Sequence, residues 1–204
     1  MRDRPLAIRQ PTGQENHATT INTRKPARDF FNSLLEGLEF AERTLLDNLK
    51  ADLIDRILES SPEFFEKMVV KLLTSMFRSE TAEEAASHLG KPGDGGVDGV
   101  IRLDPLGIDR VFIQAKRYAR DSKVGRPDLQ SFSGSLDDKQ TTRGVFITTS
   151  NFSEEAKQYV KRIAKQIVLI DGSRLVELLV RYDVGVRVDR LIAVKKIDED
   201  FFDE

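Results

Sequence analysis

The order of strand-like and helix-like segments is the feature that most constrains the fold of this chain. Four short apolar runs, each bounded by turn residues, are typical of β-strands: residues 97–103, 111–118, 144–149 and 167–170. Apolar residues at helical spacing lie before, between and after these runs: residues 30–58, 62–77, 127–138, 153–165 and 173–182. This order predicts an α/β, three-layer fold in which a mixed central sheet is flanked by helices.

Two further features complete the predicted architecture. A short turn over residues 104–109 joins the first two strands, so this pair should be antiparallel. Residues 184–197 alternate enough to predict an edge strand or a hairpin. Ser61 before Pro62 is a typical helix start, with Ser as N-cap and Pro in the first turn.

Composition excludes several functional classes. The 204 residues include no cysteine, which excludes thiolate zinc sites, disulfides and thiol nucleophiles. No run approaches the roughly 20 apolar residues of a membrane span, and the N-terminus lacks the apolar core of a secretory signal. We therefore expect a cytoplasmic protein. Residues 1–28 are polar and basic and should be disordered.

Charge is unevenly distributed along the chain. The net charge is −2, yet residues 110–126 carry six basic residues against one acid. Four of the six lie at the end of the second strand or after it and are candidates for binding DNA phosphates: Arg117, Arg120, Lys123 and Arg126. A solvated loop explains the charge of this stretch equally well.

Three residues of the first two strands carry the most chemistry. Period-2 alternation places Gln114 and Lys116 on one face of the second strand, and Asp98 begins the first. A carboxylate, an amide oxygen and the backbone carbonyl of Ala115 are ligands that Mg²⁺ accepts. Lys116 could orient or deprotonate a water and stabilise transition-state charge. This set suits metal-assisted phosphodiester hydrolysis.

Each of these residues also has a purely structural explanation. Asp98 could close a glycine-rich turn, Gln114 could be a hydrogen-bonded polar residue of a half-buried strand, and Lys116 could be solvated. Glu66 lies at the flank of an apolar helical stripe, where a glutamate is usually exposed. If its helix packs beneath the first two strands, Glu66 would add a second carboxylate. The combination, rather than any single residue, favours a nuclease.

Five ordered sequence blocks resemble the catalytic domain of Mrr-like restriction endonucleases, a branch of the PD-(D/E)xK nucleases. The blocks are Ser61–Glu66, Gly93–Asp98, Gln114–Tyr118, Arg143–Phe152 and Leu169–Ser173. The resemblance implies that Asp98 binds metal, Gln114 replaces the usual glutamate, Lys116 is the catalytic lysine and Glu66 is the helix-borne glutamate. Val97 stands where the superfamily has proline.

The resemblance also carries expectations for DNA binding and function. It places Thr148, Thr149 and Ser150 near an approaching scissile phosphate. It implies an Mg²⁺-dependent endonuclease that restricts foreign or methylated double-stranded DNA as a homodimer or higher oligomer. It implies three regions: residues 1–28, a helical linker at 29–60 and a catalytic domain at 61–204. The expected winged-helix domain does not fit within residues 1–28.

Two other functions remain open at this stage. A non-catalytic DNA-binding or assembly module could retain the fold, since Gln114 is neutral and the net charge is negative. A structure-specific nuclease, such as a junction resolvase, would share the chemistry and differ only in its substrate.

Overall fold

A computed structural model describes residues 24–77, 97–104 and 106–203 of the chain. Backbone contacts divide the chain into two compact units, Met1–Thr44 and Leu45–Glu204. The described part of the first unit lies within helix α1 (Arg24–Glu59). The second unit holds the last turns of α1 and all other described elements.

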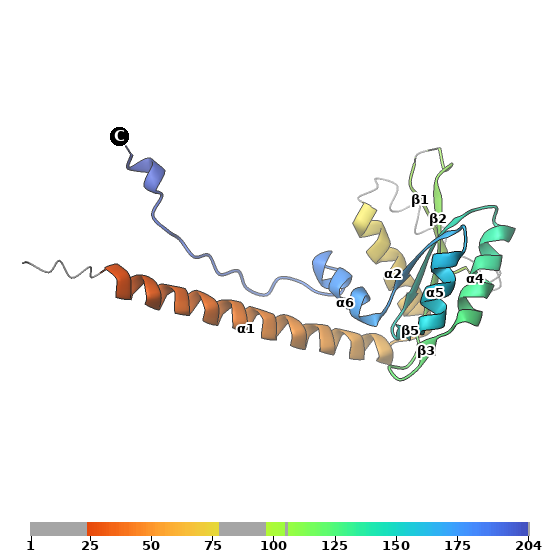
Figure 1. The fold of residues 1–204 in the computed structure, drawn as a ribbon, viewed down its shortest axis with the longest axis horizontal. Helices are drawn as coiled ribbons and strands as arrows, with labels where there is room; N and C mark the ends of the chain where they lie inside the picture. Colours follow the sequence, from red (N-terminus) through yellow and green to blue (C-terminus); the bar gives the residue numbers. More distant parts are fainter. Residues whose placement is uncertain (1–23, 78–96, 105, 204) are drawn as a thin grey trace, which may run out of the picture. The chain divides into compact units, whose positions relative to one another are not determined.

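Helices and strands alternate through the second unit (Figure 1). The helices after α1 are α2 (Pro62–Phe77), α4 (Arg126–Asp138), α5 (Glu154–Arg162), α6 (Gly172–Arg181) and the 3₁₀ turn η1 (Glu199–Phe201). The strands are β1 (Gly99–Arg102), β2 (Arg110–Lys116), β3 (Lys123–Val124), β4 (Arg143–Thr148), β5 (Asn151–Phe152) and β6 (Gln166–Ile170). The α2 helix begins as expected, because the Ser61 hydroxyl accepts a hydrogen bond from the Phe64 N–H at 3.1 Å.

The main sheet has the strand order β1-β2-β4-β6. Strand β1 is antiparallel to β2, whereas β2, β4 and β6 run parallel to one another. This confirms the predicted mixed sheet and its antiparallel first pair. In the register, Gly99 lies opposite Ile113, so Asp98, the preceding residue, reaches the level of Gln114.

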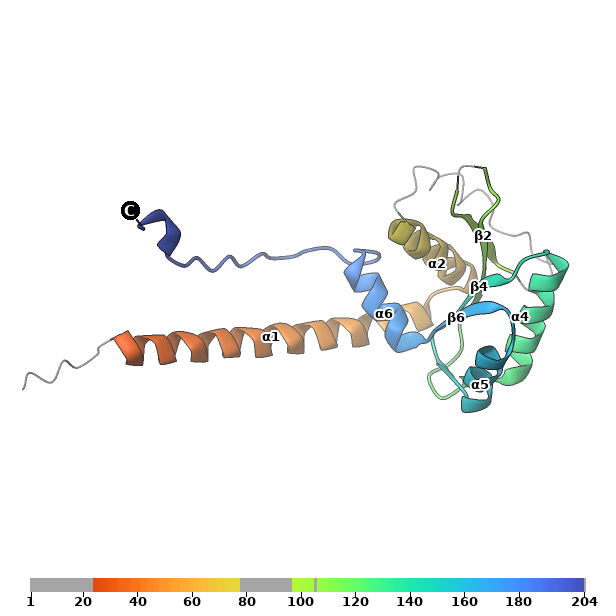
Figure 2. The same cartoon turned by 45° about the horizontal axis from the view of Figure 1, so that its top comes forward.

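Helices cover both faces of this sheet, with α2 and α6 on one side and α4 and α5 on the other (Figure 2). The core on the α2 and α6 side includes Leu53 and Ile57 of α1, and takes Ile113 and Ala115 from β2. The core on the α4 and α5 side takes Phe112. Alternate residues of β2 therefore enter different cores, as period-2 geometry requires, and the three-layer prediction is confirmed.

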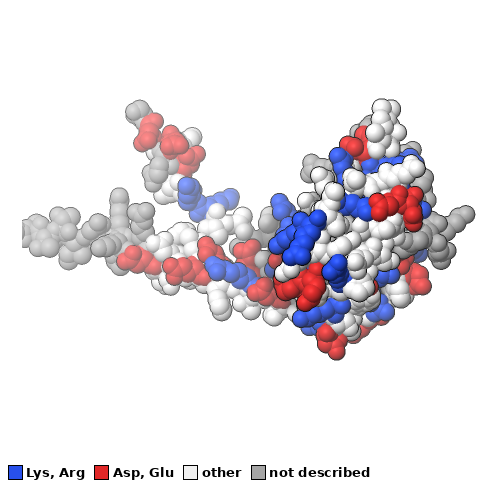
Figure 3. Space-filling model, turned by 45° about the vertical axis from the view of Figure 1, so that its right-hand side comes forward, with Lys and Arg blue, Asp and Glu red and all other residues white. Residues whose placement is uncertain are grey.

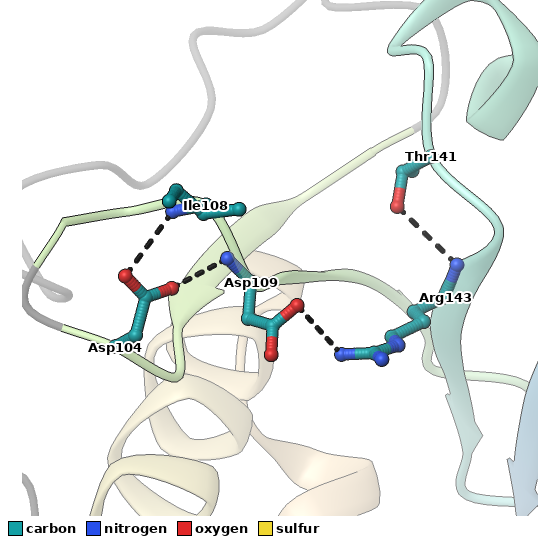
Figure 4. A network of polar contacts seen from close by, with 5 residues as sticks. All are labelled: Asp104, Ile108, Asp109, Thr141 and Arg143. Atoms are coloured by element: carbon teal, nitrogen blue, oxygen red, sulfur yellow. Dashed lines mark hydrogen bonds and ion pairs between the residues drawn. The ribbon is translucent and has the colours of Figure 1, made fainter.

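A network of polar contacts fixes the turn between β1 and β2 (Figure 4). The Asp104 carboxylate accepts backbone hydrogen bonds from Leu106, Ile108 and Asp109. The bond from Asp109, followed by the other backbone bonds, lowers the pKa of Asp104. Asp109 then pairs with Arg143 of β4 at 3.0 Å. This turn holds β1 in register with β2 and so contributes to the position of Asp98.

Three parts of the fold differ from the sequence prediction. Helix α1 begins at Arg24, so residues 24–28, expected to be disordered, are helical, and residues 1–23 lie outside the described residues. Residues 184–197, expected to form an edge strand or a hairpin, contain no strand, so that prediction is wrong. Their alternation has no effect without a partner strand, because strand pairing is a property of two segments. The two-residue strands β3 and β5, which form a small parallel sheet, are too short to show periodicity in the sequence. None of the described helices combines the length and apolar character that a membrane crossing requires.

Candidate active site

Asp98 lies at the open edge of the sheet, immediately before β1. Its N–H donates to the Ile113 carbonyl at 2.8 Å, and its Oδ2 accepts a hydrogen bond from the Ala115 N–H at 2.7 Å. Both bonds fix the carboxylate against β2. The other carboxylate oxygen, Oδ1, has no hydrogen bond in the described part of the chain, and it is the better candidate for binding a cation.

Gln114 occupies the neighbouring position on β2 and is 5% exposed. Among the described residues, its Oε1 atom has no hydrogen-bond partner although it is buried. A buried, unpaired amide oxygen is unfavourable by about 1–3 kcal/mol. A cation that accepts this oxygen as a ligand would remove that penalty.

The backbone of β2 contributes a third oxygen. Within a strand, N–H and C=O of one residue point to the same side, and this side alternates along the chain. The Ala115 N–H bonds to Asp98, whereas the Lys116 carbonyl accepts from Thr149 N–H at 3.3 Å on the opposite side. The Ala115 carbonyl therefore lies on the Asp98 side of β2.

Glu66 reaches this site from α2. A Cβ on Gly99 would lie 3.3 Å from the Val70 side chain, so α2 packs directly on the start of β1. Glu66 lies one helical turn before Val70, on the same face of the helix. Desolvation raises the pKa of Glu66; the nearby Asp98 and then Glu63 raise it further, and Lys116 lowers it.

Glu66 therefore lies within electrostatic range of both Asp98 and Lys116. The Glu66 and Asp98 carboxylates and the amide of Gln114, which lies opposite Asp98 in the register, are hard oxygen donors of the kind that a divalent cation such as Mg²⁺ accepts. No group of three or more His, Asp or Glu side chains able to hold a metal occurs in the described ranges. A cation here would therefore depend on the Gln114 amide, the Ala115 carbonyl and water as well.

Arg117 differs from the other basic candidates. Its guanidinium Nη1 donates to the carbonyl of Leu58 in the last turn of α1. Its Nε atom is buried and has no partner among the described residues. Because the final carbonyls of a helix lack partners within the helix, Arg117 has a clear structural role in joining β2 to α1.

The three remaining basic candidates are exposed and have weaker constraints. Arg120 pairs with Asp55 of α1. The Arg126 guanidinium lies 5.5 Å from the centre of the Tyr159 ring. Lys123 lies on β3 and is exposed. All three remain candidates for contact with phosphates.

Thr148 ends β4, Thr149 and Ser150 follow it, and all three are buried. The Thr149 hydroxyl donates to the Tyr118 carbonyl at 2.6 Å. The Thr148 and Ser150 hydroxyls lie 3.2 Å apart and share a hydrogen bond. These bonds hold the segment after β4 against the end of β2. A role in DNA binding stays a prediction.

A hollow with both polar and apolar lining residues adjoins this segment, with a volume of about 390 Å³. Its polar lining residues come from α1, from the segments after β2 and β4, and from the start of α6: Asp47, Lys50, Arg120, Thr149, Ser150, Asn151 and Ser173. Sequence reasoning missed Lys50, Asn151 and Ser173. No local pattern marks them, because the hollow forms only when four separate segments meet.

The fold and this arrangement of carboxylates, amide and lysine define the restriction-endonuclease class of α/β proteins. The family model Mrr_cat, described as a restriction endonuclease, matches residues 57–179. The chain therefore belongs to the Mrr restriction-endonuclease family through its catalytic domain.

Individual relatives agree with this assignment. The chain is 40% identical over 168 residues to the type IV methyl-directed restriction enzyme EcoKMrr of Escherichia coli strain K12, covering 82% of this chain and 54% of that protein. The chain thus spans about half the length of this relative. The DNA modification-dependent restriction endonuclease AspBHI has a similar fold, with a TM-score of 0.50, 21% identity, and coverage of 67% of this chain and 36% of that one.

Proposed function

We propose that this chain is an Mg²⁺-dependent DNA endonuclease that hydrolyses phosphodiester bonds in modified or foreign DNA. One observation carries the proposal. Glu66, Asp98 and Lys116 influence one another electrostatically, and Gln114, which lies opposite Asp98 in the register and two residues before Lys116, has a buried oxygen without a partner among the described residues. A buried amide oxygen without a partner is unfavourable, and so are two half-buried carboxylates that repel each other, so a bound cation would stabilise this arrangement.

Each residue has a distinct role in this proposal. Asp98, the Gln114 amide and the Ala115 carbonyl would hold the cation directly, and Glu66 would hold it through a bound water. When bound, the Mg²⁺ supplies positive charge to the scissile phosphate and lowers the pKa of a coordinated water. Lys116 orients the attacking water and stabilises the negative charge that develops on the phosphate.

The proposed substrate rests on the named relatives. EcoKMrr is methyl-directed and AspBHI is modification-dependent. We infer that methylated double-stranded DNA is the preferred substrate of the protein to which this chain belongs. We also infer that two copies act together, since two active sites can cut the two strands of a duplex in one binding event.

A DNA-binding module without catalytic activity is the second candidate, and the neutral Gln114 favours it. The two candidates differ in metal dependence. A binding module would bind DNA equally with Mg²⁺ or chelator and leave both strands intact. An endonuclease would cut only with the metal.

The decisive experiment measures nicking and linearisation of supercoiled plasmid, methylated and unmethylated, with Mg²⁺ or with chelator. Lys116→Ala is the matched variant. Its cleavage rate should fall by about 10²–10³, because loss of one transition-state electrostatic group is worth about 3–4 kcal/mol. Its DNA affinity should be unchanged. Metal-independent cutting, or full activity of Lys116→Ala, would contradict the proposal.

A further inference from the structure

The backbone turns sharply directly after Lys116. Lys116 is the last residue of β2 and lies opposite Thr148 of β4. Its carbonyl accepts a hydrogen bond at 3.1 Å from the N–H of Tyr118, two residues later, which is the bond of a γ-turn. Lys116 thus lies where the regular strand ends, and its position depends on the contacts that hold this turn.

Thr149 contacts both ends of the turn. Its N–H donates to the Lys116 carbonyl at 3.3 Å, and its hydroxyl donates to the Tyr118 carbonyl at 2.6 Å. The Thr149 side chain is buried, so water does not compete for these bonds. Two hydrogen bonds from one buried residue therefore constrain the backbone of residues 116–118.

The backbone of Thr149 is itself held by α6. The Gly172 N–H donates to the carbonyl of Ser150, the residue after Thr149, at 2.9 Å. The Thr149 carbonyl oxygen lies so close to Gly172 that a Cβ there would approach it to 2.3 Å. Thr149 therefore connects the packed start of α6 with the backbone of Lys116.

The hydrogen-bond donors of Thr149 are both used inside the protein. A threonine has one O–H donor and one backbone N–H donor, and these bind the Tyr118 and Lys116 carbonyls. A phosphate oxygen can only accept hydrogen bonds, so a phosphate contact by Thr149 would break one of the two bonds. Thr149 is therefore better suited to hold the turn than to bind DNA directly.

We propose that Thr149 is a positioning residue for DNA cleavage, because its two hydrogen bonds hold the backbone of Lys116 at the end of β2. The inference rests on the proposed function, in which Lys116 orients the attacking water. Thr149 acts through Lys116 and contacts neither the metal nor the substrate. A displacement of about 1 Å in such a group can slow a reaction by roughly 10²-fold.

The test uses three single variants of the full chain. Thr149→Val keeps the shape of the side chain and removes its donor, whereas Thr149→Ser keeps the donor. Thr141→Val is the matched control, because the Thr141 hydroxyl accepts a bond from the Arg143 N–H at 3.3 Å at the opposite end of β4. Single-turnover cleavage of methylated plasmid with Mg²⁺ and saturating protein gives the rate, and binding titrations with chelator give the DNA affinity. Both are measured at a temperature at which circular dichroism shows every variant folded.

Thr149→Val should cut roughly 10–10²-fold more slowly than the wild type, with unchanged DNA affinity. Thr149→Ser and Thr141→Val should cut at nearly the wild-type rate. In a Lys116→Ala background, Thr149→Val should slow the residual cleavage by less than about twofold, because a residue that acts through Lys116 has little effect without it.

Three results would overturn the inference and leave the proposed function intact. These are a wild-type cleavage rate in Thr149→Val, a loss of DNA affinity that accounts for its slower cleavage, and an undiminished effect of Thr149→Val in the Lys116→Ala background. A wild type that does not cut, or that cuts no faster than Lys116→Ala, would instead overturn the proposed function and this inference with it.

Discussion

At the scale of single residues, the candidate site contains groups that are unfavourable without a ligand. Glu66 has a raised pKa because it is partly desolvated and faces Asp98. The Gln114 oxygen is buried without a partner in the described part of the chain. Unfavourable groups of this kind are common at functional sites, where a ligand relieves the penalty.

Glu66→Gln should have opposite effects on stability and cleavage. A raised pKa means that the folded state holds its proton to higher pH than the unfolded state does. The associated stability is present below about pH 4.3 and is lost as pH rises through the folded pKa. Without metal, Glu66→Gln should therefore raise the melting temperature at pH 7–8 and leave it unchanged near pH 4, while plasmid cleavage falls. An equal rise in melting temperature at both pH values would show that the stabilisation does not come from removing the ionised Glu66 carboxylate.

At the scale of elements, close packing at the ends of strands positions the site. The start of α6 lies against the segment after β4, where the Gly172 N–H donates to the Ser150 carbonyl at 2.9 Å. A Cβ on Gly172 would lie 2.3 Å from the Thr149 carbonyl oxygen. No side chain fits this contact, so glycine is required there for packing.

Gly172→Ala should destabilise the protein by about 1–3 kcal/mol, because α6 or the segment after β4 must shift. Gly134→Ala in α4 is the matched control. A Cβ on Gly134 meets nothing within 4 Å, so alanine there should stabilise the helix by about 0.5–1 kcal/mol. Urea denaturation measures the free energy of unfolding of both variants. Equal effects of the two substitutions would contradict the packing argument.

Arg117 joins β2 to α1, so replacing it should lower the free energy of unfolding more than replacing Arg120 does. Arg117→Ala leaves the Leu58 carbonyl without this partner and should cost about 1–3 kcal/mol of unfolding free energy. Arg120→Ala removes an exposed ion pair to Asp55 and should cost less than about 1 kcal/mol. Urea denaturation of both variants tests this difference. A larger loss in Arg120→Ala would contradict it.

At the scale of the whole molecule, the net charge is small and negative. Figure 3 shows Lys and Arg side chains beside Asp and Glu on one face, in keeping with a net charge of −2. DNA binding must therefore depend on local groups rather than on the overall field. The exposed cations after β2 are the best candidates.

Arg120→Ala and Lys123→Ala should each weaken DNA binding and reduce the salt dependence. If each side chain neutralises one phosphate, the slope of log affinity against log salt should fall by roughly one. Arg162→Ala, an exposed arginine of α5 outside the basic run, is the control. Binding titrations between low and moderate salt measure the slope. Slopes equal to that of the wild type would show that the run is only solvated surface.

The sequence by itself determined most of the helices and strands. It also determined that Asp98 lies at the level of Gln114, on the strand next to the one that carries Gln114 and Lys116. Hydrophobic periodicity and strand alternation are local properties, so they can be read over a few residues. The antiparallel turn then places Asp98 beside Gln114.

Only the tertiary structure decided how distant segments meet. It placed Glu66 beside Asp98, bonded Arg117 to α1, buried Thr148, Thr149 and Ser150, and left residues 184–197 without a partner strand. Each of these outcomes depends on contact between segments far apart in the chain. Local patterns specify which face of an element is apolar, but the partner of that face is set by packing of the whole fold.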